Sequence, residues 1–204
     1  YPLRRQRQMC IRDSANIIGI QGSVTNSSVQ SYTGDGRDNI IVGDFNRRNI
    51  IDGGIGSDTL WGGQLSDIYH VDSESDVIAG EFTNQFFGPN TDKVVSTAHR
   101  YILSDQLEVL ELKGEAALFG GGNDLDNVFL LSYGHEGVTF EGGLGDDFYV
   151  VNASTQIVED ADGGHDTLVA RASSYTLGEN IEDGKIQAAN ATLVGNNLNN
   201  TLWA

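Results

Sequence analysis

The sequence has little cysteine, little proline and no long apolar run. Its 204 residues include one Cys, at position 10, and two Pro. A single Cys excludes a disulfide within the chain. No apolar run exceeds five residues, which excludes a transmembrane helix, because such a helix needs about 20 consecutive apolar residues.

Basic residues are scarce as well. Lys and Arg total 12 against 29 Asp and Glu, and the net charge is -17. A chain this acidic is repelled by phosphate backbones, so we expect no nucleic-acid partner. Cations are the partners that this charge favours.

Glycine is abundant instead. The chain has 26 Gly, roughly one residue in eight, against an average of about 7%. Gly in a helix interior costs about 1 kcal/mol relative to Ala, so this composition disfavours helices. We expect an all-β fold.

The first fourteen residues differ from the rest. They hold four of the nine Arg, the only Met and the only Cys. Their string RQRQMCIRDS resembles translated read-through of a sequencing adapter. We treat residues 1–14 as a non-native segment and leave them out of fold reasoning. A genuine basic arm is the alternative.

A long repeat divides the remainder. Three short elements recur in the same order in a unit of about 75–90 residues, and the first of them is Asp38-Asn39-Ile40-Ile41, which recurs as Asp126-Asn127-Val128-Phe129. We place a first long repeat, with a preceding partial unit, at residues 15–121. A second, truncated repeat covers residues 122–204. We expect further repeats or a functional domain to flank this chain in a longer parent protein.

A nine-residue repeat lies inside the long one, of the form Gly-Gly-x-Gly-x-Asp-x-U-x, where U is a large apolar residue. Residues 53–61 and 142–150 match at all five defined positions. Windows starting at Thr33, Gly62 and Gly121 match at four of five. Gly allows the positive φ angles of a tight loop, and Asp supplies a carboxylate oxygen of the kind that Ca²⁺ prefers.

These motifs resemble the hemolysin-type calcium-binding repeat of RTX proteins. The resemblance implies right-handed parallel β-roll (β-solenoid) segments, near residues 33–78 and 121–159, with β-rich spacers near 79–120 and 160–194. Two nonapeptides would make one turn, U residues would point inward, and Ca²⁺ would lie between stacked loops. The implied site residues are Gly34, Gly36, Asp38, Gly53, Gly54, Gly56, Asp58, Gly62, Gly63, Asp67, Asp76, Gly121, Asp126, Gly142, Gly143, Gly145 and Asp147.

Loops that are two nonapeptides apart should lie on the same edge of such a roll. This spacing pairs Asp58 with Asp76. Bulges of two and three residues would pair Asp38 with Asp58, and Asp126 with Asp147. The Gly62–Asp67 loop should face residues 44–49, where we expect an arginine to replace the cation beside Asp67. Ordinary tight turns are the alternative for these loops, and a solvated acidic turn is the alternative for Asp72 and Asp76.

The resemblance also implies a biological setting. Such regions leave the cell unfolded by type I secretion and fold outside with calcium, so we expect a secreted or cell-surface protein. No catalytic constellation is visible, since His70, His99, His135 and His165 are isolated in the sequence. We therefore expect a structural calcium-binding module and not an enzyme. The alternatives are the carboxy-terminal calcium-binding module of a secreted protease, lipase or polysaccharide epimerase, and a toxin segment.

Overall fold

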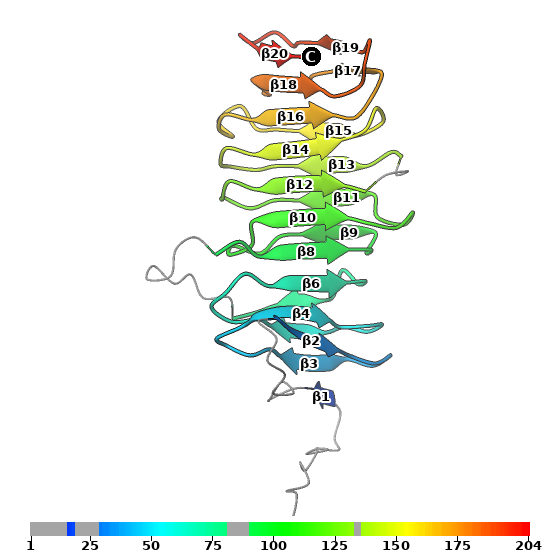
Figure 1. Cartoon of the computed structure of the whole chain (residues 1–204), viewed down its shortest axis with the longest axis vertical. Coiled ribbons are helices and arrows are strands. Elements are labelled where there is room, and N and C mark those ends of the chain that lie inside the picture. The colour runs from blue at the N-terminus through cyan, green and yellow to red at the C-terminus, as the bar shows by residue number, and fades with distance from the viewer. Residues whose placement is uncertain (1–15, 19–28, 81–89, 133–135) are drawn as a thin grey trace, which may run out of the picture.

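The computed structural model describes residues 16–18, 29–80, 90–132 and 136–204. The segment 1–14, set apart above, and His135 lie outside these residues. The described chain is all-β and contains no helix, as expected, and so none that could cross a membrane. Its parallel strands stack into a β-solenoid of about nine turns (Figure 1).

The even-numbered strands form one continuous ten-stranded parallel sheet. They are β2 (Val29–Thr33), β4 (Arg48–Asp52), β6 (Ile68–Val71), β8 (Lys93–Ser96), β10 (Val109–Leu112), β12 (Val128–Leu131), β14 (Phe148–Val151), β16 (Thr167–Ala170), β18 (Asp183–Ile186) and β20 (Thr201–Trp203).

The odd-numbered strands form the opposite face in three separate sheets. The first sheet has β1 (Asn16–Ile18), β3 (Asn39–Val42), β5 (Thr59–Trp61) and β7 (Val77–Ile78). The second has β9 (Arg100–Ile102), β11 (Phe119–Gly121), β13 (Thr139–Glu141) and β15 (Gln156–Val158), and the third has β17 (Ser174–Thr176) and β19 (Thr192–Val194).

The length of a turn varies along the solenoid. Ile50 pairs with Ile68, and Thr59 with Val77, so a turn there takes two nonapeptides, as expected. The next turn is longer, since Ile68 pairs with Lys93, and the one after it is shorter, since Lys93 pairs with Val109. The segments expected as spacers contribute β8 to β11 and β16 to β19, so they are turns of the same solenoid.

Large apolar side chains fill the interior between the two faces. The U residues of the best nonapeptides, Leu60, Tyr69 and Tyr149, are fully buried, which confirms the inward direction expected for them. Tyr149 stacks on Phe129 with ring centroids 4.9 Å apart. The interior between the two faces is therefore largely apolar.

The two edges carry the loops. We call the edge where loops lead into strands of the ten-stranded sheet the long-sheet edge. We call the opposite edge, where loops lead from that sheet into the shorter sheets, the short-sheet edge. The segments 38–41 and 126–129 match in sequence but lie on opposite faces, because the first leads into β3 and the second into β12. The two copies of the long repeat therefore align differently in the structure than in the sequence.

Candidate functional site: carboxylates between stacked loops

A column of acidic and amide side chains runs along the long-sheet edge. It has one residue per turn, at the start of each strand of the ten-stranded sheet from β4 onward. The residues are Asn49, Asp67, Asp92, Glu108, Asn127, Asp147, Asp166, Glu182 and Asn200. We call this set the carboxylate column. The order Asn-Asp-Asp-Glu occurs twice and then begins again, so the long repeat corresponds to four turns of the solenoid.

Each carboxylate of the column caps the backbone of the turn before it. The backbone N–H of Asn49 donates to Oδ1 of Asp67 at 2.6 Å, and that of Asp67 donates to Oδ1 of Asp92 at 2.6 Å. The N–H of Asp92 donates to Oε2 of Glu108 at 2.8 Å. Glu stands where the turn is shortest, because its longer side chain still reaches the backbone of the preceding turn.

The second copy repeats these hydrogen bonds. The N–H of Asn127 donates to Asp147 Oδ1 at 2.7 Å, and that of Asp147 donates to Asp166 Oδ1 at 2.9 Å. The N–H of Asp166 donates to Glu182 Oε2 at 2.8 Å. Between the copies, the side-chain amide of Asn127 donates to the carbonyl of Leu107 at 3.1 Å. The amide of Asn127 thus joins the second copy of the repeat to the first without adding another negative charge to the column.

A shorter column of the same kind lies at the short-sheet edge. The N–H of Asn39 donates to Asp58 Oδ1 at 2.7 Å, and that of Asp58 donates to Asp76 Oδ1 at 2.9 Å. This places Asp58 beside Asp76, as the spacing predicts. Asp76 is buried, and its Oδ2 accepts the N–H groups of Asp72 and Ser73, both at 3.1 Å. Asp76 is therefore not solvated, whereas Asp72 and Glu74 in the same turn are exposed.

Several carboxylate oxygens in or beside these columns are buried without a hydrogen-bond partner. Within the described part of the chain these are Oδ2 of Asp58, Oδ2 of Asp67, Oδ2 of Asp166 and Oε2 of Glu159. Burial raises the pKa of Asp67 and of Asp147 to about 7, and that of Asp166 to about 6. Burial also raises the pKa of Asp58, and the charges of Asp76, Asp72 and Asp38 raise it further.

Two of the three windows that match at four positions, those starting at Thr33 and Gly121, are shifted by one residue in the structure, whereas the Gly62 window keeps Asp67 buried and Tyr69 inward. Asn39 and Asn127 occupy the buried place that Asp58 and Asp147 occupy in the full matches, and Ile41 and Phe129 point inward. The neighbouring Asp38 and Asp126 are exposed. Asp38 accepts the N–H of Ser57 at 3.0 Å, and Asp126 accepts that of Asp146 at 2.8 Å. Each of these Asp residues therefore lies on the outer side of its loop stack.

The glycines of the repeat have two structural roles. Gly54 and Gly143 have φ angles of 80° and 108°, in the left-handed region that other residues resist. Gly34, Gly53, Gly62 and Gly142, at the first position of their loops, lie under the side chain of the sixth residue, where no Cβ fits. Gly56, Gly63 and Gly145 pass closely over the carbonyls of neighbouring loops. Gly36 faces open space, and Gly121 ends β11.

The Gly62–Asp67 loop faces residues 44–49, as expected. The N–H of Gln64 donates to the carbonyl of Phe45 at 3.1 Å. The side chain that donates to Asp67 is the amide of Asn49, at 2.9 Å from Oδ1. Arg47 forms an ion pair with Asp44 at 3.4 Å, and Arg48 is exposed. An amide therefore stands beside Asp67 where we expected an arginine.

Sequence reasoning missed one group of acidic residues. Asp147, Glu159 and Asp166 each offer an oxygen, and these oxygens lie within 4.8 Å of one another. We call this group the interior trio. Glu159 follows β15 and Asp166 precedes β16, so only the stacking of turns brings them to Asp147. A weak signal existed in Gly163-Gly164-His165-Asp166, which is a shortened form of the nonapeptide.

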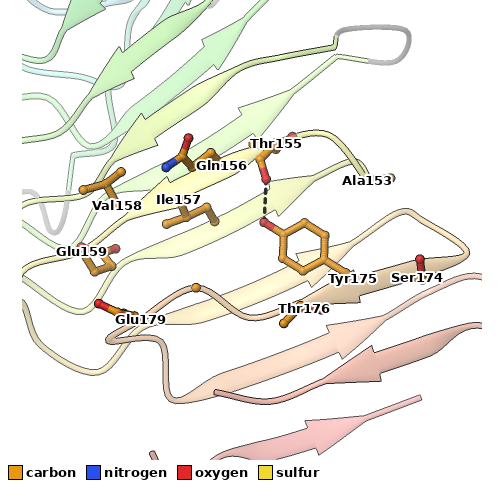
Figure 2. A pocket seen from close by; sticks show the side chains of 11 residues that line it. Ala153, Thr155, Gln156, Ile157, Val158, Glu159, Ser174, Tyr175, Thr176 and Glu179 are labelled. Atoms are coloured by element: carbon orange, nitrogen blue, oxygen red, sulfur yellow. Dashed lines mark hydrogen bonds between the residues drawn. The ribbon is translucent and has the colours of Figure 1, made fainter. Parts of the chain in front are cut away.

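A groove opens beside the interior trio, where β15 and β17 belong to different sheets. Its volume is about 690 Å³, and Glu159 is among its lining residues. Figure 2 shows Glu159 and Glu179 at one end of the groove. Further along, the hydroxyl of Tyr175 donates to the carbonyl of Thr155 at 2.8 Å.

The three histidines that the structure describes lie outside the carboxylate columns and the interior trio. His165 is exposed, and its Nε2 lies 3.1 Å from Oδ2 of Asp183. His70 is partly exposed on β6, and His99 is exposed.

Comparisons of the chain with protein-family models, with curated proteins and with solved structures find no match.

Proposed function

We propose that this chain binds Ca²⁺ between its stacked Gly-rich loops and that binding is coupled to folding. The observation that carries the proposal is the pair of unpartnered oxygens on Asp58 and Asp67, two residues at the sixth position of the nonapeptide. Both side chains are about 1% exposed. Oδ1 of each residue accepts hydrogen bonds, but an ionised carboxylate whose other oxygen is buried without a partner is destabilised unless a proton or a cation neutralises it.

The surroundings of Asp58 favour a hard cation. A Cβ built on Gly54 would lie 2.7 Å from the carbonyl oxygen of Asp35, and one built on Gly56 would lie 2.7 Å from that of Arg37. Because glycine has no Cβ, the loop of residues 34–39 can bring these two carbonyls close to the backbone of the loop of residues 53–58. Ca²⁺ takes six to eight oxygens at about 2.3–2.6 Å, and two stacked loops can supply more of them than one.

Coupling to folding follows from charge. Stacking the turns brings Asp38, Asp72 and Asp76 close enough to raise the pKa of Asp58. In a chain with a net charge of -17, this repulsion opposes folding until cations neutralise the columns. Binding free energy then becomes folding free energy.

The role that fits such a module is structural, within a secreted or cell-surface protein. The four-turn order Asn-Asp-Asp-Glu supports this role, because each copy can stack on the next without a break in the hydrogen bonds of the column. A calcium-binding module attached to a secreted enzyme, or a toxin segment, is the alternative. An upstream catalytic sequence in the parent reading frame would favour that alternative, and further four-turn units would favour the structural role.

Calcium titration of the chain tests the proposal. We expect circular dichroism to show little β-structure in EGTA and a cooperative gain with Ca²⁺. Mg²⁺ should not substitute, because it holds its waters and demands tight octahedral geometry. Asp58→Asn keeps the acceptor for Asn39 but removes the charge, and it should raise the calcium concentration needed for folding. Asp124→Asn, on an exposed loop residue, is the matched control.

The opposite outcome is equally clear. A β spectrum that is the same in EGTA and in Ca²⁺, with no heat of binding by calorimetry, would show a metal-independent solenoid. Equal effects of Asp58→Asn and Asp124→Asn would show that Asp58 is not a ligand.

A further inference from the structure

The interior trio differs from the sites described by the nonapeptide. Asp147 ends a Gly-rich loop, but Glu159 follows the short strand β15 and belongs to no repeat. The three side chains are 1%, 8% and 1% exposed for Asp147, Glu159 and Asp166. Among the described residues, they are the one group of three or more acidic or histidine side chains whose ligand atoms meet this closely.

The hydrogen bonds of the interior trio leave two oxygens unpartnered. Oδ1 of Asp147 and Oδ1 of Asp166 accept backbone N–H groups at 2.7 and 2.9 Å. The hydroxyl of Tyr149 lies between Oε1 of Glu159 and Oδ2 of Asp147, and its one proton can serve only one of them at a time. Oε2 of Glu159 and Oδ2 of Asp166 have no hydrogen-bond partner in the described chain.

No protein cation forms an ion pair with these carboxylates, although the charge of His165 lowers the pKa of Asp166. None of the ion pairs between described residues includes Asp147, Glu159 or Asp166. The N–H of Gly143 lies near Glu159 and lowers its pKa, but it makes no hydrogen bond of good geometry to Oε2. Three carboxylates thus share a buried space with one phenol proton and two backbone N–H groups that belong to the column.

Backbone carbonyls extend the set of oxygens. A Cβ built on Gly163 would lie 3.0 Å from the carbonyl oxygen of Asp160, 3.1 Å from that of Gly143 and 3.6 Å from Oε2 of Glu159. The missing side chain of Gly163 therefore leaves open a space that three oxygens face. All these donors are oxygens, which suit Ca²⁺ and not a metal that prefers nitrogen or sulfur.

We infer that Asp147, Glu159 and Asp166 bind a divalent cation of the calcium type, in an interior site separate from the loop site at Asp58. The groove between β15 and β17 gives the ion a path, since Glu159 lines it (Figure 2). Glu179 is exposed at the same end of the groove and lies outside the interior trio. This inference does not depend on the proposed function, because the interior trio would hold an ion even if the loops of residues 34–76 stayed empty.

The test counts the calcium ions bound by the whole chain in isothermal titration calorimetry. Glu159→Gln keeps the size of the side chain and an oxygen that accepts from Tyr149, and we expect it to bind one ion fewer. Glu179→Gln, from the same groove, is the matched control and should keep the full number. Asp166→Asn should lose the same ion as Glu159→Gln, so the inference stays testable if one variant folds poorly.

The outcomes separate the two proposals. If Glu159→Gln and Asp166→Asn bind as many ions as the unmodified chain while Asp58→Asn loses one, the interior site is refuted and the loop site stands. If Glu159→Gln loses an ion and Asp58→Asn does not, the loop site at Asp58 is refuted. If Glu159→Gln only stabilises the calcium-free chain, the interior trio holds protons and the inference is wrong.

Discussion

Gly53 lies directly beneath the carboxylate of Asp58: a Cβ on Gly53 would be 2.3 Å from Oδ2. The same relationship joins Gly62 to Asp67 and Gly142 to Asp147, with distances of 2.1 and 2.2 Å. The first glycine of the nonapeptide is therefore required by the sixth residue of its own loop. The acidic side chain folds back over the glycine and caps the preceding turn.

Gly53→Ala should destabilise the calcium-loaded chain by about 1–3 kcal/mol, the usual cost of overpacking a filled site. Gly36→Ala is the matched control from the neighbouring loop of the same stack, because a Cβ there meets nothing within 4 Å. It should change stability by less than about 0.5 kcal/mol, as for an ordinary surface substitution. Urea unfolding at saturating calcium measures both, and equal losses would contradict the fit described for Gly53.

Asp58→Asn should weaken calcium binding more than Asp67→Asn. Carboxylates of Asp76, Asp72 and Asp38 act on Asp58, so a cation there neutralises several charges. Asp67 has the amide of Asn49 on its Oδ1 and the charge of Asp92 nearby, so it attracts a cation less strongly. Calorimetry of the two variants decides the order, and a larger loss at Asp67 would reverse our ranking of the two loop stacks.

The calcium-free chain should become less stable as pH rises from about 4 to about 8. Burial raises the pKa of Asp67 and Asp147 from 3.8 to about 7, and that of Glu159 from 4.5 to about 8. In this window the folded state holds protons that the unfolded state has released. Raising the pH therefore favours unfolding until the pH exceeds the folded-state pKa values.

Saturating calcium should reverse this trend, because protons and cations compete for the same carboxylates. The folded fraction measured by circular dichroism at pH 5 and pH 8, in calcium-depleted and calcium-saturated buffer, follows both trends. The variant Asp67→Asn should show a weaker pH dependence without calcium. Greater stability at pH 8 than at pH 5 in calcium-depleted buffer would show that these carboxylates are already paired.

The nonapeptide predicts the loops that it matches in full. It fails where an Asp and an adjacent Asn could each occupy the sixth position of the loop. Asp58 and Asp147 lie where the pattern places them, each with its inward U residue two positions later. At 38–39 and 126–127 an Asp precedes an Asn, and the sequence pattern selects the Asp. The structure buries the Asn instead, because an amide can satisfy buried donors and acceptors without adding charge.

The turns without Gly-rich loops could not be recognised from the pattern. Residues 97–99 and 171–173 connect strands on the two faces with short links that carry no motif. The unequal lengths of the turns on either side of β8 also break any fixed spacing. For this reason Asp92 and Glu159 become candidates only when the stack of turns is known, and Asp166 carries only the weak signal of a shortened nonapeptide.

The groove between β15 and β17 should not cleave polysaccharides, although two carboxylates, Glu159 and Glu179, lie at one end of it (Figure 2). A glycosidase needs one carboxylic acid and one carboxylate, both free to act on either side of a sugar. Glu159 is held by Tyr149 and by its place in the interior trio. The aromatic lining residue, Tyr175, is 8% exposed, and its hydroxyl is committed to Thr155, so it offers no platform for a sugar ring.

We therefore expect no products from alginate, pectin or casein at calcium concentrations that saturate folding. The assays are release of reducing ends, formation of unsaturated uronates, and release of peptides. Glu179→Gln is the test variant for any turnover, since Glu179 is exposed, lies outside the interior trio and should not be needed for folding. Turnover that co-purifies with the chain and is lost in Glu179→Gln would show that the groove is catalytic, and the chain would then be an enzyme and not only a calcium-binding module.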